Sequence, residues 1–82
     1  MVSQDEIISI IKRKGPVIPA KIAKEIGHNI LMTSAMLSEL VSDGKIRISN
    51  LKVGGSPLYY LPGQEDQLKN FKEYLNDKEQ KA

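Results

Sequence analysis

The chain has 82 residues, a net charge of +2 and 40% apolar residues, a length and composition that support one compact domain. One phenylalanine, three tyrosines and no tryptophan leave the core to aliphatic side chains. The absence of cysteine excludes disulfide scaffolds and cysteine-containing zinc sites, and a single histidine gives little support to a catalytic or metal site, so we expect neither an enzyme nor a cofactor.

The charge is unevenly distributed along the chain. Between Lys12 and Lys52 there are eight basic and three acidic residues, a net charge of +5, whereas from Gln64 onward four basic and five acidic residues give −1. A basic middle segment favours an anionic partner, with ordinary solvated lysines as the alternative.

No targeting or membrane-spanning segment is indicated. No apolar run approaches the roughly 18 residues of a membrane span. The N-terminus carries acid where a signal peptide carries base, so we expect a cytoplasmic, nucleoid-associated protein without membrane contacts.

A first helix is predicted between Ser3 and Gly15-Pro16. The stretch Ser3-Gln4-Asp5-Glu6 is typical of a capping box, and Val2 and Ile7 fit a hydrophobic staple. The apolar positions of this helix are Ile7, Ile8 and Ile11.

Two further helices follow a short apolar pair, Val17-Ile18, which is able to pair at a sheet edge. The second helix starts at Pro19, buries Ile22, Ala23 and Ile26, and ends at Gly27. Asn29 caps the third helix, over residues 30–43, whose predicted inner face is Ile30, Thr33, Leu37, Leu40 and Val41. Two helices joined by a short turn with glycine are typical of a helix-turn-helix.

The periodicity then changes to that of strands. Residues 45–49 alternate and residues 58–61 are aromatic between two prolines, which predicts two antiparallel strands joined by a projecting loop over 50–56. Of Tyr59 and Tyr60, one is expected in the core and the other half-exposed. Residues 65–79 predict a last helix, with a stripe formed by Leu68, Phe71 and Leu75.

This order of elements resembles the winged helix-turn-helix family. The stretch Leu40-Val41-Ser42-Asp43-Gly44-Lys45-Ile46 is similar to the passage from that family's recognition helix into its first wing strand, and residues 47–61 are similar to wings of archaeal members. The resemblance implies an α+β, mostly α fold with a three-helix core and a two- to three-stranded antiparallel wing. It divides the chain into a domain at 1–63 and a C-terminal helix at 64–82, which packs on the domain, forms a homodimer or continues into a further domain.

The resemblance also implies binding of double-stranded DNA, as in a transcription regulator or its N-terminal domain. The recognition helix 30–43 would enter the major groove, with the predicted outer positions Met32, Ser34, Ala35, Met36, Ser38 and Glu39. These positions include no Arg, Lys, Gln or Asn for a bidentate base contact. We therefore expect the chain to bind mainly through the DNA backbone.

The backbone contacts are predicted outside that face. Candidates on the second helix, at the turn and in the wing 49–56 with its first flanking strand are Lys21, Lys24, His28, Asn29, Arg47, Asn50 and Lys52. The interpretation favoured for His28 by itself is a capping or solvated turn residue rather than a DNA contact. Three to five neutralised phosphates would give a salt slope of roughly −3 to −4.

A second hypothesis is a winged helix used for protein assembly rather than DNA binding. Met32 and Met36 would then form an adaptable contact for a protein partner, or else belong to the core. The sequence does not indicate the DNA site, the regulated genes, an effector or the oligomeric state.

Overall fold

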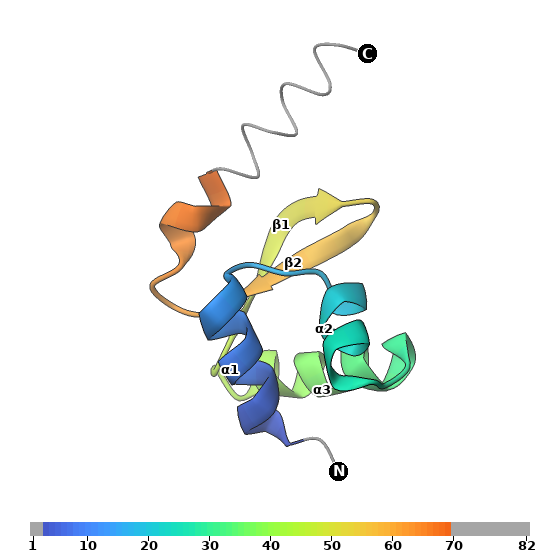
Figure 1. Ribbon diagram of the computed structural model, residues 1–82. Coiled ribbons are helices and arrows are strands. Elements are labelled where there is room, and N and C mark those ends of the chain that lie inside the picture. The colour runs from blue at the N-terminus through green and yellow to red at the C-terminus, as the bar shows by residue number, and fades with distance from the viewer. Residues whose placement is uncertain (1–2, 70–82) are drawn as a thin grey trace.

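The computed structural model describes residues 3–69, which fold into a mainly helical α+β domain (Figure 1). The helices are α1 (Gln4–Lys14), α2 (Pro19–Ile26) and α3 (Ile30–Ser42), and the strands are β1 (Arg47–Val53) and β2 (Ser56–Tyr60). Residues 65–69 are also helical. The predicted α+β class is thus confirmed for the described part of the chain.

The helix ends follow the predicted capping residues. At the start of α1 the Glu6 N–H donates to Ser3 Oγ over 3.3 Å, and at the start of α3 the Met32 N–H donates to Asn29 Oδ1 over 2.8 Å. Gly27 ends α2 with a left-handed φ of 73°, a conformation that favours glycine. Helix α3 ends at Ser42, one residue before the predicted end. Val2 of the predicted staple lies outside the described residues.

The core lies where the three helices meet the sheet. In α1 the buried residues are Ile7, Ile10 and Ile11, so Ile10 takes the place predicted for Ile8, which is only half-buried. The other members of the core cluster lie on α2, α3 and β2 and in the segments before α2 and before β1: Val17, Ile22, Leu37, Leu40, Ile46 and Tyr59. Burial of each large aliphatic side chain contributes about 1.5–3 kcal/mol relative to exposure.

The strands are longer than predicted, and the loop between them is shorter. Strand β1 runs to Val53, which pairs with Ser56, so the connection is the two-residue turn Gly54-Gly55 rather than a loop over 50–56. Both glycines have positive φ, 60° and 84°, as in a type I′ hairpin turn. Backbone pairing therefore converts most of the predicted loop into sheet.

A bulge interrupts the register of this hairpin. Ile48 pairs with Tyr59 and Lys52 with Pro57, so three residues of β1 lie opposite one residue of β2. Within the bulge the Leu51 N–H donates to Ser49 Oγ over 2.9 Å. Ile48 is 48% exposed although Ile46 is buried, so the simple alternation predicted for residues 45–49 is wrong.

Val17 adds a third backbone segment to the hairpin. It forms an isolated antiparallel bridge with Tyr59, with hydrogen bonds of 3.0 and 2.8 Å in the two directions. Tyr59 is buried and Tyr60 half-buried, which confirms the predicted division between the two tyrosines. Val17 thus pairs at the sheet edge as predicted.

Gln64 joins the segment after β2 to α1, a contact that the sequence analysis missed. Its side chain is buried: Oε1 accepts from the Leu61 N–H over 2.9 Å, and Nε2 donates to the Ile11 carbonyl oxygen over 2.9 Å. The helical segment 65–69 therefore begins beside the C-terminal end of α1. Leu68 is half-buried, and Phe71 and Leu75 lie outside the described residues, so the predicted dimer stripe stays a prediction.

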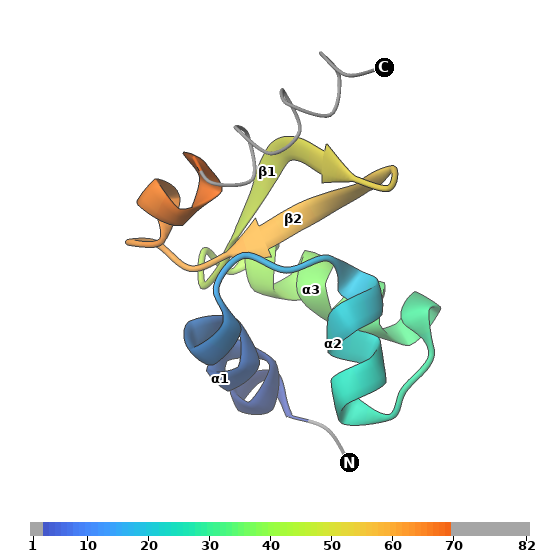
Figure 2. The same cartoon turned by 45° about the horizontal axis from the view of Figure 1, so that its top comes forward.

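Different elements lie at the two ends of the domain. Residues 65–69 lie near α1 at one end, and the turn of the hairpin and the first turn of α3 lie at the other (Figures 1 and 2). Ile18 and Lys21 at the start of α2 line a small cleft with Val53 and Leu58 of the hairpin. The start of α2 thus lies against the hairpin.

Candidate nucleic-acid interface

Helix α2 exposes its two predicted lysines while its opposite face is buried. Lys21 and Lys24, one turn apart, are exposed, whereas Ile22 and Ala23 are buried in the core. An open hollow of about 430 Å³ is lined by Lys14, Lys21, Lys24 and Glu25. Two cations of α2 thus lie on one open surface.

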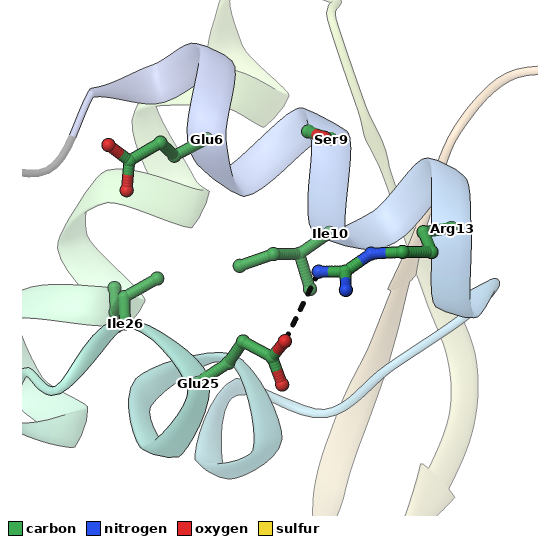
Figure 3. A pocket seen from close by; sticks show the side chains of 6 residues that line it. All are labelled: Glu6, Ser9, Ile10, Arg13, Glu25 and Ile26. Atoms are coloured by element: carbon green, nitrogen blue, oxygen red, sulfur yellow. Dashed lines mark hydrogen bonds and ion pairs between the residues drawn. The ribbon is translucent and has the colours of Figure 1, made fainter.

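Glu25 partly neutralises the cations at the end of α1. Its carboxylate lies 3.1 Å from Arg13 Nη2 and 3.4 Å from Lys14 Nζ, and Figure 3 shows Arg13 reaching across from α1. The charge of Lys14 is the main reason that the pKa of Glu25 lies below its usual range, and Arg13 adds to the shift. These pairs link α1 to α2, so Arg13 and Lys14 are less available to a phosphate than Lys21 and Lys24.

The two cations of β1 lie at opposite ends of the strand. Lys52 is exposed and adjoins the turn, whereas Arg47 pairs with Tyr60 at the base of the hairpin, on the order of 15 Å away. The backbone N–H groups of Glu65 and Gly63 hold the pKa of the Glu65 carboxyl below its usual range, and the charge of Arg47 contributes to this shift. Arg47 therefore has a carboxylate nearby and lies at the base of the hairpin, whereas Lys52 lies close to its turn.

The residues between α2 and α3 are exposed, and two of them make hydrogen bonds that stabilise the turn and the start of α3. Asn29 uses its side-chain oxygen as the cap of α3, and its carbonyl oxygen accepts from Thr33 Oγ1 over 2.9 Å. The His28 side chain is exposed, and its backbone N–H donates to the Ala23 carbonyl oxygen over 3.1 Å. Asn50, in the bulge of β1, is exposed as well.

The outer face of α3 differs from the predicted one at its first turn and at Met36. Met32 is 53% exposed and Ser38 is exposed, as predicted, but Met36 is half-buried and packs against the core. Ser34 is half-buried too. The predicted Met32/Met36 pair therefore does not form one exposed patch.

Ile30 and Leu31 were the side chains of α3 that the sequence analysis misjudged or missed. Ile30, predicted as core, is 54% exposed because it directly follows the cap, before the part of α3 that is buried. Leu31 is 80% exposed. The exposure of Leu31 could have been predicted from helix geometry, since a rotation of about 100° per residue places Leu31 on the side of the helix opposite Leu40.

The fold therefore brings Lys21 and Lys24 to one hollow with Lys14 and Glu25. Lys21 also lies beside Val53 of the hairpin, whereas Arg47 lies at the other end of β1 from Lys52. In residues 3–69, no group of three or more His, Asp or Glu side chains is placed to hold a metal ion. Over the same range, no helix is long and apolar enough to cross a membrane.

The comparisons with known proteins do not assign the chain to a family. No family model matches it, and no match was found among curated proteins or solved structures. The proposed function therefore depends on the geometry and charge of the described residues.

Proposed function

We propose that this chain is a winged helix-turn-helix module that binds double-stranded DNA, as a transcription regulator or the N-terminal domain of one. The observation that carries the proposal is that three lysines, Lys21, Lys24 and Lys52, are exposed on α2 and on the hairpin that lies against the start of α2. The α2–turn–α3 pair followed by a two-stranded hairpin supports the same fold family.

In this proposal α3 enters the major groove and the hairpin is the wing. Lys52, beside the turn, contacts the phosphate backbone on one side, and Lys21 and Lys24 contact it from α2. His28 and Asn29 lie at the N-terminus of α3, where the helix dipole favours a phosphate. Arg47 contributes less, because the carboxylate of Glu65 is nearby.

The number of available cations sets the expected salt dependence. Three phosphate contacts give a slope of log K against log salt of about −3, since each contributes about 0.9. The affinity for duplex DNA should then fall about 40-fold between 50 and 200 mM salt. This estimate is at the low end of the one from sequence, because Arg47 has the carboxylate of Glu65 nearby.

Fluorescence anisotropy of a labelled mixed-sequence duplex at about 50 and 200 mM salt tests the proposal. We expect the double variant Lys21→Ala/Lys52→Ala to bind more weakly and to reduce the slope to about −1. Lys12→Ala/Lys45→Ala is the matched control for charge, since Lys45 Nζ donates to Gln4 Oε1 over 3.4 Å at the start of α1. Equal losses in both double variants, or no binding at about 50 mM salt, would contradict the proposal.

The second candidate function is a winged-helix module for protein assembly. The observation that favours it is the exposed apolar first turn of α3, formed by Ile30, Leu31 and Met32. Sedimentation velocity over a range of protein concentrations distinguishes the two functions. Self-association that Leu31→Ser abolishes, without any DNA binding, would support the assembly function.

A further inference from the structure

The first turn of α3 exposes apolar side chains, although the partner proposed above, DNA, is charged. Ile30, Leu31 and Met32 are 54%, 80% and 53% exposed, and Ala35, one turn after Leu31, is exposed as well. Single exposed apolar residues are common on protein surfaces, but adjoining ones usually mark a binding surface.

This surface lies at the same end of the domain as the turn of the hairpin, close to which Lys52 lies in β1 (Figures 1 and 2). Lys21 lies at the start of α2 beside the hairpin. A partner that contacts these cations and the start of α3 must therefore present both negative charge and an apolar group. Duplex DNA does so in its major groove, where the C5-methyl group of thymine lies between the phosphate backbones.

The same surface lacks the groups that read bases by bidentate hydrogen bonds. Residues 30–42 contain no Arg, Lys, Gln or Asn. The side-chain oxygen of Asn29 accepts the cap hydrogen bond from Met32, and Ser38 has a hydroxyl that donates to and accepts from several bases alike. Base discrimination at the start of α3 is thus left to apolar contact.

We propose that Leu31, flanked by Met32 and Ala35, recognises C5-methyl groups of pyrimidines in the major groove. The inference rests on the proposed DNA-binding function and adds its specificity. Leu31 is the central contact because it is the most exposed large apolar side chain in the described residues. Thymine carries this methyl group, and so does 5-methylcytosine.

The test compares matched duplexes that differ only in the methyl group. An A·T-rich duplex is prepared with thymine or with deoxyuridine, and a C·G-rich duplex with cytosine or with 5-methylcytosine. Each methyl group that Leu31 contacts should raise the affinity about fourfold, as expected for one buried methyl-sized group. Anisotropy at fixed salt measures the affinity ratio within each pair.

The variant Leu31→Ala should reduce the thymine-to-deoxyuridine ratio to about one while leaving the salt slope of about −3 unchanged. The matched control is Ile48→Ala, which removes a 48% exposed apolar side chain from β1 and should keep the wild-type ratio. Circular dichroism checks that both variants are folded. A gain with both methylated duplexes assigns the methyl group itself as the ligand, and a gain with thymine alone confines the site to A·T pairs.

Three outcomes would overturn the proposal. Equal affinity of the wild type for thymine and deoxyuridine duplexes would do so while leaving salt-dependent DNA binding, and hence the proposed function, intact. A ratio that survives in Leu31→Ala would assign the preference to duplex shape. If duplexes are not bound at all and Leu31→Ala changes only the self-association of the protein, the surface is a protein contact and both proposals fail.

Discussion

Two surfaces of the domain differ in chemistry. The outer side of α2 and the hairpin presents Lys21, Lys24 and Lys52, whereas the outer face of α3 presents Ile30, Leu31 and Met32 and contains no cation. Contacts to phosphates position a protein on DNA, and contacts to base edges specify the sequence. Under the proposed function, affinity and specificity are therefore carried by separate elements.

The cationic surface is smaller than the sequence suggests. Of the eight basic residues between Lys12 and Lys52, Arg13 and Lys14 pair with Glu25, and Arg47 lies near Glu65. Ion pairing in the fold therefore reduces the number of basic side chains that are available to an anionic partner. Predictions that alter one surface at a time, or neither, test this separation.

The largest effect is expected from a variant that weakens the fold and changes neither surface. Gln64→Ala removes the hydrogen bonds to Leu61 N and Ile11 O, and should lower the free energy of unfolding by about 2 kcal/mol. Urea denaturation measures this loss, and the exposed Gln67→Ala is the control. The salt slope of duplex binding should stay near −3 for the folded variant, so a changed slope would show that the surfaces are not independent of this link.

A cation added to the exposed face of α3 should give this face an affinity for phosphates that it lacks in the wild type. Glu39 is exposed on α3, and Glu39→Lys should raise duplex affinity about tenfold and make the salt slope more negative by about 0.9. Asp66→Lys makes the same charge change in the segment 65–69, at the other end of the domain. If the two variants gain equally in anisotropy titrations, the outer face of α3 does not meet DNA.

Asn29 lies between the two surfaces, and its roles in folding and binding are separable. Asn29→Ala should lower the free energy of unfolding by about 1 kcal/mol, because the cap of α3 is lost. Asn29→Asp keeps the cap but adds a negative charge, so it should retain stability and lower duplex affinity about threefold. Thermal unfolding and anisotropy of both variants measure the two effects, and unchanged affinity in Asn29→Asp would place this residue away from the phosphates.

The smallest effect is expected at Glu25, because its removal adds two unpaired cations to the cationic surface. Glu25→Gln releases Arg13 and Lys14 and should raise duplex affinity about twofold. Because the folded-state pKa of Glu25 is lowered, its stabilising contribution is present above the ordinary glutamate range, near about pH 4, and is lost as the pH falls through the lowered pKa.

The melting temperature of Glu25→Gln should therefore lie slightly below that of the wild type at pH 7. The two values should converge in acid, and Glu39→Gln serves as the control with an exposed carboxylate on α3. A difference that is constant with pH would mean that the ion pairs do not contribute.

The boundaries of the three helices were predictable because they depend on local chemistry. Ser3, Gly15, Gly27 and Asn29 act on backbone groups within three or four residues, and the sequence shows these signals directly. The hairpin was less predictable. Its bulge and its two-residue turn depend on which residues of β1 and β2 pair, and the composition of residues 50–56 resembled a loop.

The candidate site was predictable in its residue types and not in its arrangement. Lys21, Lys24, Arg47 and Lys52 were identified from their charge and their places on the predicted second helix and wing, but the sequence did not show that Glu65 lies near Arg47. Leu31 was overlooked, and Ile30 was assigned to the core, because a periodic pattern does not show where packing against neighbouring helices begins.

The sequence by itself thus determined the order of elements, the capped helix ends and the excess of positive charge in the middle of the chain. The tertiary structure alone decided which cations remain available, which side of α3 is exposed, and that Gln64 is buried against α1. The physical reason is distance along the chain: caps join near neighbours, whereas Gln64 and Ile11 are 53 residues apart and meet only when the core has formed.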